Sequence, residues 1–251
     1  KSMRVQLASD VHLEWSQPAF SSIIRQTEDV LVLAGDVGVF DDRTLEFIEW
    51  CSSKYEHVIY VPGNHERYSS TCDMEEVDMK FKTFCKTQGN VFYAPCDTVI
   101  IDDVVFICAT LWSHVPQQSQ QEASECINDY SYVRTQGRPI TPSETNAFHA
   151  AHKEYIIKQL AESVGRECVV ITHHPPYTGK TSHPRYDGSS LSSAFTSDYI
   201  LEIYPEHLPS LWLCGHTHYN FSMTVNGTRL ISNQYQRDGG NSYNAGTSIQ
   251  I

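Results

Sequence analysis

Seven aspartate, histidine and asparagine side chains recur just after short apolar runs of the sequence, and all are of types that bind divalent metal ions. They comprise four imidazoles, two carboxylates and one amide, more than the four ligands of a structural zinc site. Because no thiolate is among them, the set fits manganese, iron, zinc or cobalt better than copper(I) or iron–sulfur chemistry. The candidates are Asp10, His12, Asp36, Asn64, His173, His216 and His218.

The apolar runs that precede these residues are expected to be buried strands of an α/β sheet. They are short and rich in β-branched residues, and they cover residues 5–8, 30–34, 58–61, 104–109, 169–171 and 211–214. Ligands of open α/β sheets bind outside the carboxyl ends of the strands, so we expect the candidates to converge there. A single carboxylate can bridge two ions about 3.5–4 Å apart. The sequence therefore predicts a dinuclear metal site at the strand ends.

Helical patterns lie between the runs, at residues 43–54, 73–88, 144–163 and 196–203. The third is the best marked, because Thr141 and Glu144 form a capping-box pattern with Pro142 at the first helical position. An Asn-Gly pair at residues 226–227 predicts a hairpin. Residues 113–128 and 174–196 look irregular, and we expect the second of these segments to be a mobile rim of the site.

Composition limits the partners and the compartment. With 251 residues, the chain is expected to form one domain over 1–251. Its formal net charge of −12 makes long nucleic acid an improbable substrate, because nucleic-acid binders carry basic surfaces. The sequence has no apolar run long enough for a membrane span, and its eight cysteines form no CxxC pair. We expect reduced thiols, no membrane partner and a cytoplasmic location.

Five motifs occur in a fixed order along the chain: Asp10-x-His12, Gly35-Asp36, Gly63-Asn64-His65-Glu66, His173 and Gly215-His216-x-His218. Each is weak alone, but together and in this order they resemble the motifs of the calcineurin-like metallophosphoesterases over residues 4–232. Further similarity at residues 110–112, 128–130 and 172–176 is shared with a small single-domain branch of that family.

This resemblance implies a fold, a ligand assignment and a reaction. The fold is α/β, a four-layered α/β/β/α sandwich of two mixed sheets. Asp36 would bridge two divalent ions, and a hydroxide between the ions would attack phosphorus. His65 would contact the phosphoryl group and protonate the leaving oxygen. By the same resemblance, one ion would be held by Asp10, His12 and His218, and the other by Asn64, His173 and His216.

The leading hypothesis is a hydrolase of small phosphate esters, with a phosphodiester or nucleotide-like substrate slightly ahead of a monoester. A protein phosphatase or nuclease is the alternative within the same fold, although the chain has no basic groove for a polymer. A scaffold without catalysis is a third possibility. Loss of ligand residues would indicate it, and none of the motif positions is lost.

Candidate substrate contacts are Trp112, His114, Asn128 and His174. Trp112 and His114 follow the run at residues 104–109, although core packing and solvent exposure explain them equally well. Asn128 is either a contact, a group that orients metal ligands, or a helix cap. His149 and His152 are expected on the surface of the 144–163 helix. Surface positions are likewise preferred to phosphate contacts for Arg67, Arg185 and Arg237.

Overall fold

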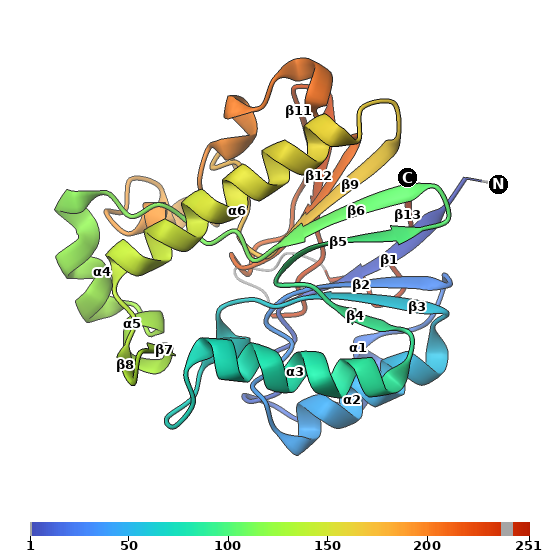
Figure 1. The fold of residues 1–251 in the computed structure, drawn as a ribbon, viewed down its shortest axis with the longest axis horizontal. Helices are drawn as coiled ribbons and strands as arrows, with labels where there is room; N and C mark the ends of the chain where they lie inside the picture. The colour runs from blue at the N-terminus through green and yellow to red at the C-terminus, as the bar shows by residue number, and fades with distance from the viewer. Residues whose placement is uncertain (1, 237–242) are drawn as a thin grey trace.

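The computed structural model describes residues 2–236 and 243–251, and two β-sheets packed face to face form its centre (Figure 1). In these residues the first sheet has the strand order β13-β1-β2-β3-β4. Its parallel strands are β1 (Arg4–Ala8), β2 (Val30–Ala34), β3 (His57–Val61) and β4 (Val91–Tyr93), and β13 (Ile249–Gln250) pairs antiparallel with β1.

The second sheet has the order β11-β12-β10-β9-β6-β5 in the same residues. Its four inner strands are parallel, and its two edge strands run antiparallel to their neighbours. The inner strands are β12 (Thr228–Ser232), β10 (Leu211–Cys214), β9 (Glu167–Thr172) and β6 (Val104–Ala109), and the edges are β11 (Ser222–Val225) and β5 (Cys96–Ile101). Both sheets are therefore mixed.

Alternation along the strands explains the layers. In β2, Val32 points into the apolar core between the two sheets, whereas Leu31 and Leu33 pack on helices. In β6, Phe106 belongs to the core between the sheets and Ile107 to the core under a helix. The helices α1 (Phe20–Ile23), α2 (Asp42–Lys54) and α3 (Met74–Gln88) cover the first sheet, and α6 (Pro142–Glu162) covers the second (Figure 1). The predicted four-layered α/β/β/α sandwich is confirmed.

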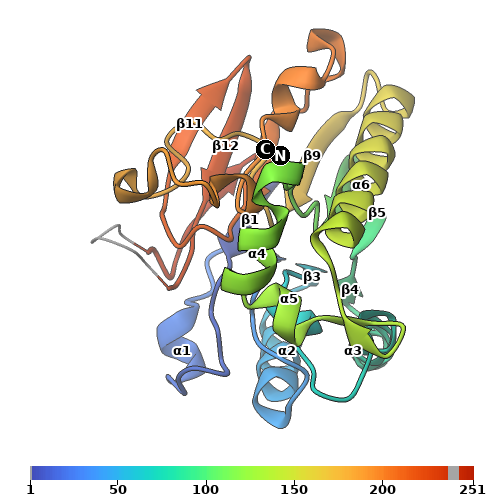
Figure 2. The same ribbon diagram turned by 90° about the vertical axis from the view of Figure 1, so that its left-hand side faces the viewer.

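Short elements project beyond the sheets at one end, which Figure 2 views directly. They include α4 (Gln120–Cys126), α5 (Asp129–Tyr132) and the small hairpin of β7 (Arg134–Thr135) and β8 (Arg138–Pro139). Single 3₁₀ turns complete the described elements: η1 (His65–Arg67), η2 (Gln117–Ser119), η3 (Pro184–Tyr186), η4 (Ser192–Ala194), η5 (Tyr199–Glu202) and η6 (Pro205–His207). Within the described residues, no helix combines the length and apolar character needed to cross a bilayer.

Two local predictions are confirmed. The helix α6 begins at Pro142. The Thr141 side chain accepts the Glu144 backbone amide, and the Glu144 carboxylate accepts the Thr141 backbone amide, as the capping box predicts. The Asn226-Gly227 turn joins β11 to β12, with both residues at positive φ as a type I′ turn requires.

Two others are wrong. Residues 113–128 were expected to be irregular, yet they contain η2 and α4, because Ala123 packs into the apolar cluster around Trp112. The helix expected at residues 196–203 is only the turn η5. The amides of Ser197 and Ile200 bond to carbonyls of Pro175 and Pro176, 3.3 and 3.0 Å away, so they do not extend a helix.

His149 and His152 are buried, which contradicts the predicted helix surface position. Both bond the backbone of Leu111, which has a φ of 72° just beyond β6. His152 Nδ1 accepts from the Leu111 amide, and His149 Nδ1 donates to the Leu111 carbonyl, each over 3.0 Å. Because a buried backbone group without a partner is costly, these histidines satisfy the chain where it leaves the sheet.

Candidate metal centre and active site

The seven predicted ligand positions lie at the carboxyl ends of strands from both sheets. Asp10, Asp36 and Asn64 follow β1, β2 and β3, whereas His173 and His216 follow β9 and β10. Among the described residues, side-chain donors form three groups whose ligand atoms lie within 4.8 Å of one another. His12, Glu14 and His65 form one of them, and the other two consist of predicted ligands alone. Of these two, the first group is Asp10, His12 and His218, and the second is Asp36, His173 and His216.

In the first group, the ring nitrogens face one another across a short gap. His12 Nε2 lies 3.1 Å from His218 Nε2. Asp10 Oδ1 lies 3.4 Å from His218 Nε2 and 3.8 Å from His12 Nε2. In the second group, His216 Nδ1 lies 3.2 Å from His173 Nε2. A metal ion between such atoms would accept their lone pairs and remove the repulsion between them.

Asp36 lies between the two groups. Its Oδ2 is 3.5 Å from His12 Nε2 and 3.2 Å from His173 Nε2, while its Oδ1 accepts the His65 amide over 2.9 Å. One carboxylate oxygen is thus held by backbone and the other is directed at nitrogen atoms of both groups. This is the placement that a bridging carboxylate requires.

Unpartnered oxygen atoms provide a test of whether metal ions fit. Asp10 Oδ1 and Asn64 Oδ1 are buried and have no hydrogen-bond partner. Asn64 is oriented by its other end, because Nδ2 donates to Asp129 Oδ1 over 2.7 Å. Since burying an unpaired polar atom is costly, two such oxygens beside the imidazoles fit the donor set of a metal site.

The histidine rings are also oriented for ligation. His173 Nδ1 donates to the Ala34 carbonyl over 2.7 Å, which leaves Nε2 with its lone pair directed at Asp36 and His216. His12 Nδ1 donates to the Glu14 carboxylate over 2.8 Å, which leaves Nε2 for the first group. Outer hydrogen bonds commonly fix the tautomer of ligating histidines in this way.

The backbone at these positions is strained. Asp10, His12, Asp36, His216 and His218 have φ values of 52°, 50°, 51°, 75° and 53°, in the left-handed region that residues with a side chain rarely adopt. Such conformations persist only where the surroundings impose them, and they concentrate at functional sites.

Two glycines permit the close approach of the loops. A Cβ atom at Gly63 would collide with the Asp36 carboxylate, and one at Gly215 would collide with the Asp10 carboxylate. The glycines in these motifs therefore make room for the carboxylates.

Two buried charged residues hold the loops in place. Glu66 accepts the amides of Gly63, Asp36 and Val37, and burial together with the Asp36 charge raises its pKa to about 7. Arg67 forms a bidentate ion pair with Asp78 and also donates to the Gly63 carbonyl. Arg67 is 1% exposed, so neither a surface position nor a phosphate contact describes it.

Electrostatics favour positive charge between the carboxylates. Burial raises the pKa of Asp10, but the nearby His12 and His173 imidazoles lower that pKa well below its ordinary range. Burial lowers the pKa of His12 and His173, yet the neighbouring carboxylates and their hydrogen bonds raise these pKa values to about 10 and about 9. By contrast, burial and the adjacent His173 lower the pKa of His216 to about 3.

His65 stands beside the two groups and is tied to one of them. Its Nδ1 bonds to Glu14 Oε1 over 2.9 Å, and the same oxygen accepts His12 Nδ1. The Tyr68 ring stacks on His65 with centroids 4.1 Å apart, and the Trp15 ring stacks on His12 with centroids 3.8 Å apart. The imidazole of His65 therefore has a fixed plane, with Nε2 as its remaining nitrogen.

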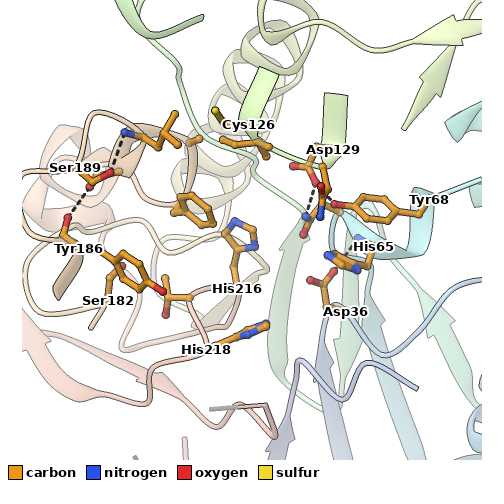
Figure 3. Close-up of a pocket in the computed structure, with 18 residues that line it drawn as sticks. Asp36, His65, Tyr68, Cys126, Asp129, Ser182, Tyr186, Ser189, His216 and His218 are labelled. Carbon is orange, nitrogen blue, oxygen red and sulfur yellow. Dashed lines mark hydrogen bonds between the residues drawn. The ribbon is translucent and has the colours of Figure 1, made fainter. Parts of the chain in front are cut away.

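A cavity of about 350 Å³ opens from the candidate metal centre (Figure 3). Asp36, His65, His216 and His218 line its inner end, and in the close-up their side chains project toward a common space. Residues 126–129 and parts of 182–195 line its outer end. The dimensions are those of a small-molecule site.

Of the four candidate substrate contacts, only Asn128 lines this cavity. Trp112 is 2% exposed and packs in an apolar cluster, and its Nε1 has no partner. His114 is exposed and lines a separate hollow along α6. His174 is buried behind His216, with ring centroids 3.9 Å apart. After β6 the chain turns away from the cavity, with Leu111 and Trp112 at positive φ. The expectation that residues following this strand lie at the site is therefore wrong for Trp112 and His114.

Sequence reasoning missed several residues that shape the site. Glu14 joins His12 to His65, and Asp129 accepts both Asn64 Nδ2 and the Tyr68 hydroxyl. The signal for Glu14 was its position two residues after His12. Asp129 directly follows the candidate contact Asn128 in the sequence, and it orients the Asn64 amide.

Comparisons with known proteins find one relative in sequence and several proteins of similar fold. An uncharacterized protein of Acanthamoeba polyphaga mimivirus is 30% identical over 257 residues, covering 92% of this chain and 91% of that protein. A phosphopantetheinyl hydrolase from Mycobacterium tuberculosis has a similar fold, with a TM-score of 0.72, 16% identity, and coverage of 94% of this chain and 90% of that one. A dimetal phosphatase from Danio rerio has a TM-score of 0.54 and 12% identity, covering 93% and 87%.

Residues 3–220 match the family model described as calcineurin-like phosphoesterase. The matched range includes all five motifs that follow the strands. The chain therefore belongs to the calcineurin-like phosphoesterase family and is a metal-dependent phosphoric ester hydrolase.

Proposed function

We propose that this chain hydrolyses small phosphate esters at a dinuclear centre bridged by Asp36, with a phosphodiester or nucleotide-like substrate favoured. The position of Asp36 Oδ2, 3.5 Å from His12 Nε2 and 3.2 Å from His173 Nε2, carries the proposal. Asp10, His12 and His218 would hold one ion, and Asn64, His173 and His216 the other. The unpartnered oxygens of Asp10 and Asn64 support this division.

Two divalent ions, when bound, would supply positive charge that activates water and neutralises the phosphoryl oxygens. The donor set of nitrogen and oxygen atoms fits manganese, iron, zinc or cobalt. The protein's own contribution is orientation. Asp129 turns the Asn64 oxygen inward, and Ala34 and Glu14 fix the tautomers of His173 and His12.

His65 is the proposed general acid. Its Nδ1 is engaged by Glu14, and its Nε2 can hold a proton for the leaving oxygen. Burial lowers the pKa of His65, but the Asp36 charge and the Glu14 hydrogen bond raise it overall, which favours the protonated ring that an acid needs. Protonation of the leaving oxygen allows an alcohol, and not an alkoxide, to depart.

The favoured substrate is small because the net charge of −12 repels polyanions and the cavity is about 350 Å³. A phosphodiester or nucleotide-like substrate is favoured because the cavity continues beyond the metal centre and has room for a large organic group on the phosphoryl group. We also propose a reducing compartment such as the cytoplasm, because all eight cysteines are free.

Metal content and a substrate panel test the proposal. Protein stripped by chelation should regain hydrolysis when Mn²⁺ is returned, and elemental analysis should give two ions per chain. The panel comprises p-nitrophenyl phosphate, bis(p-nitrophenyl) phosphate, cyclic nucleotides, dinucleotides and mononucleotides. It includes 4′-phosphopantetheine because a protein of similar fold is named a phosphopantetheinyl hydrolase. Binding of metal without hydrolysis of any ester would contradict the proposal and favour the scaffold hypothesis.

A further inference from the structure

We propose that two cap segments, residues 117–132 and 182–195, form a subsite for an uncharged leaving group with a flat apolar face. The inference rests on the proposed function and narrows it, because it specifies the alcohol that the ester carries. Neither the family nor the metal centre determines this alcohol, since it would be bound by residues outside the ligand motifs.

The cap segments continue the same cavity as the metal centre. Asp36, His65 and His216 line its inner end, and Ile127, Leu191 and Phe195 line its outer end. An ester whose phosphoryl group lies at the inner end must therefore place its alcohol group between the cap segments. Figure 3 shows this arrangement, with Cys126 and Tyr186 on the far side of the space from Asp36.

Two aromatic rings flank this space beside the imidazoles. Phe195 is 36% exposed and stacks on His216, with centroids 5.2 Å apart and planes 23° apart. Tyr68 stacks on His65 with centroids 4.1 Å apart and planes 25° apart. Because Phe195 remains partly exposed within a cavity wall, a planar group on the substrate can cover it and remove apolar area from water.

The outer end of the cavity provides hydrogen bonds from several polar groups. Among the described residues that line the cavity, none is lysine or arginine, and the polar groups at the outer end are serine hydroxyls, the Tyr186 hydroxyl, the Asn128 amide and the Cys126 thiol. Arg185 belongs to the 182–195 segment but does not line the cavity, and its guanidinium lies over the Tyr186 ring and donates to the Tyr186 hydroxyl over 2.6 Å. The Asp129 carboxylate already accepts Asn64 and the Tyr68 hydroxyl. A second anionic group on the substrate would therefore lose hydration without gaining a counter-charge. Arg237 lies outside the described residues.

The cap segments also contact each other, which defines the walls. The Ser190 hydroxyl donates to Glu122 of α4 over 2.7 Å. Leu191 and Ala194 pack on the apolar cluster that contains Trp112 and Tyr130. Phe195, directly after Ala194, is thereby held against His216 by apolar packing on one side.

Three phosphate esters with similarly basic alcohols test the subsite: ethyl, benzyl and 4-carboxybenzyl phosphate, or the methyl diesters of the same three alcohols where the substrate panel finds only diester hydrolysis. Benzyl phosphate should have a kcat/KM about tenfold above that of ethyl phosphate, because an aromatic contact adds to the burial of its ring. The carboxylate should lower kcat/KM at least about tenfold relative to benzyl phosphate, since it is buried unpaired. A 4-carboxybenzyl ester hydrolysed as well as the benzyl ester would overturn the proposal.

Phe195→Ala should lower the benzyl-to-ethyl ratio of kcat/KM about fivefold, and Phe195→Tyr should restore this ratio. Tyr204→Ala is the matched control, because Tyr204 is a 67% exposed aromatic residue that does not line the cavity. An unchanged ratio in a Phe195→Ala protein that still hydrolyses ethyl phosphate would refute the subsite alone. Failure of wild-type protein with Mn²⁺ to hydrolyse any ester, p-nitrophenyl phosphate included, would refute the proposed function.

Discussion

The loops that carry the candidate ligands and the two cap segments that enclose the cavity are held in different ways. Asp10, His12 and Asp36 are at most 1% exposed, and the buried Glu66 and Arg67 side chains bond the backbone of Asp36 and Gly63. The 182–195 segment is bridged to α4 by an exposed hydrogen bond and by a few apolar contacts. A rigid centre can fix the chemistry while weakly held segments fix the substrate, so changes in each region should have separable effects.

The largest effect is expected from Asp36→Asn. Because Asp36 faces both ligand groups, losing its charge should remove metal and activity together, with a fall in kcat/KM on the order of 10⁴-fold or more. Elemental analysis and hydrolysis of p-nitrophenyl phosphate measure the two losses. Full activity in this variant would show that the centre does not depend on a bridging carboxylate.

His65→Ala should retain both metals and lose about 10²–10⁴-fold in rate on alkyl or nucleoside esters. The loss on nitrophenyl esters should be smaller, because an acidic nitrophenol departs without a proton. Comparison of the two ester types at equal metal content distinguishes the roles. Equal losses would make His65 a group that stabilises phosphoryl charge, and loss of metal would make it a ligand.

Glu14 tests whether the rigid centre extends beyond the ligands. Glu14→Ala removes the acceptor of both His12 Nδ1 and His65 Nδ1 and should lower metal affinity or activity by about 10–100-fold, as changes around metal ligands commonly do. Glu14→Gln retains one oxygen that can accept both rings, so it should lose less. If both variants bound metal and hydrolysed alkyl esters normally, Glu14 would have no positioning role.

Sequence reasoning predicted the rigid centre better than the cap. The carboxyl ends of parallel strands lie at the same edge of a sheet. The residues that follow β1, β2, β3, β9 and β10 could therefore be expected to converge. The same argument failed after β6, because Leu111 and Trp112 adopt positive φ and direct the chain into an apolar cluster. No sequence pattern predicts this positive φ. Nor does one predict that buried histidines of α6 bond the amide and carbonyl of Leu111.

The cap could not be predicted for a related reason. The helix α4 has only seven residues and the neighbouring elements are single turns, so they lack the periodicity on which helix prediction depends. Tertiary contacts decide their positions, such as Ser190 with Glu122 and Ala123 with the Trp112 cluster. The long helix α6 has a local start signal, and its beginning was predicted correctly.

Hydrogen exchange compares the two regions directly. Backbone amides of residues 182–195 should exchange faster than those of β2 and β9, because the segment has single 3₁₀ turns and no strand pairing. A substrate analogue in the cavity should slow exchange in this segment and leave the central strands unchanged. Exchange in the segment as slow as in β2, with or without the analogue, would remove the distinction between a rigid centre and a weakly held cap.

The smallest effect concerns the start of α6, where the cap region joins the sandwich. The ion pair with Arg138 and the bonds from Thr141 lower the pKa of Glu144 from its ordinary 4.5 to about 2. Since the pKa is lower in the folded state, the ionised carboxylate stabilises the fold above about pH 4.5, and this contribution is lost as the pH falls toward 2. Glu144→Gln should therefore reduce the free energy of unfolding at pH 7 by less than about 1 kcal/mol, because water reaches the ion pair and screens it. The difference from wild type should shrink to nothing near pH 2 in denaturant titrations.

Glu154→Gln, an exposed change on the same helix, is the control. The kcat/KM of Glu144→Gln should equal that of wild type, because the capping box only anchors the helix. A change in activity without a change in stability would mean that the start of α6 is coupled to the metal centre, and the two regions would then not be separable.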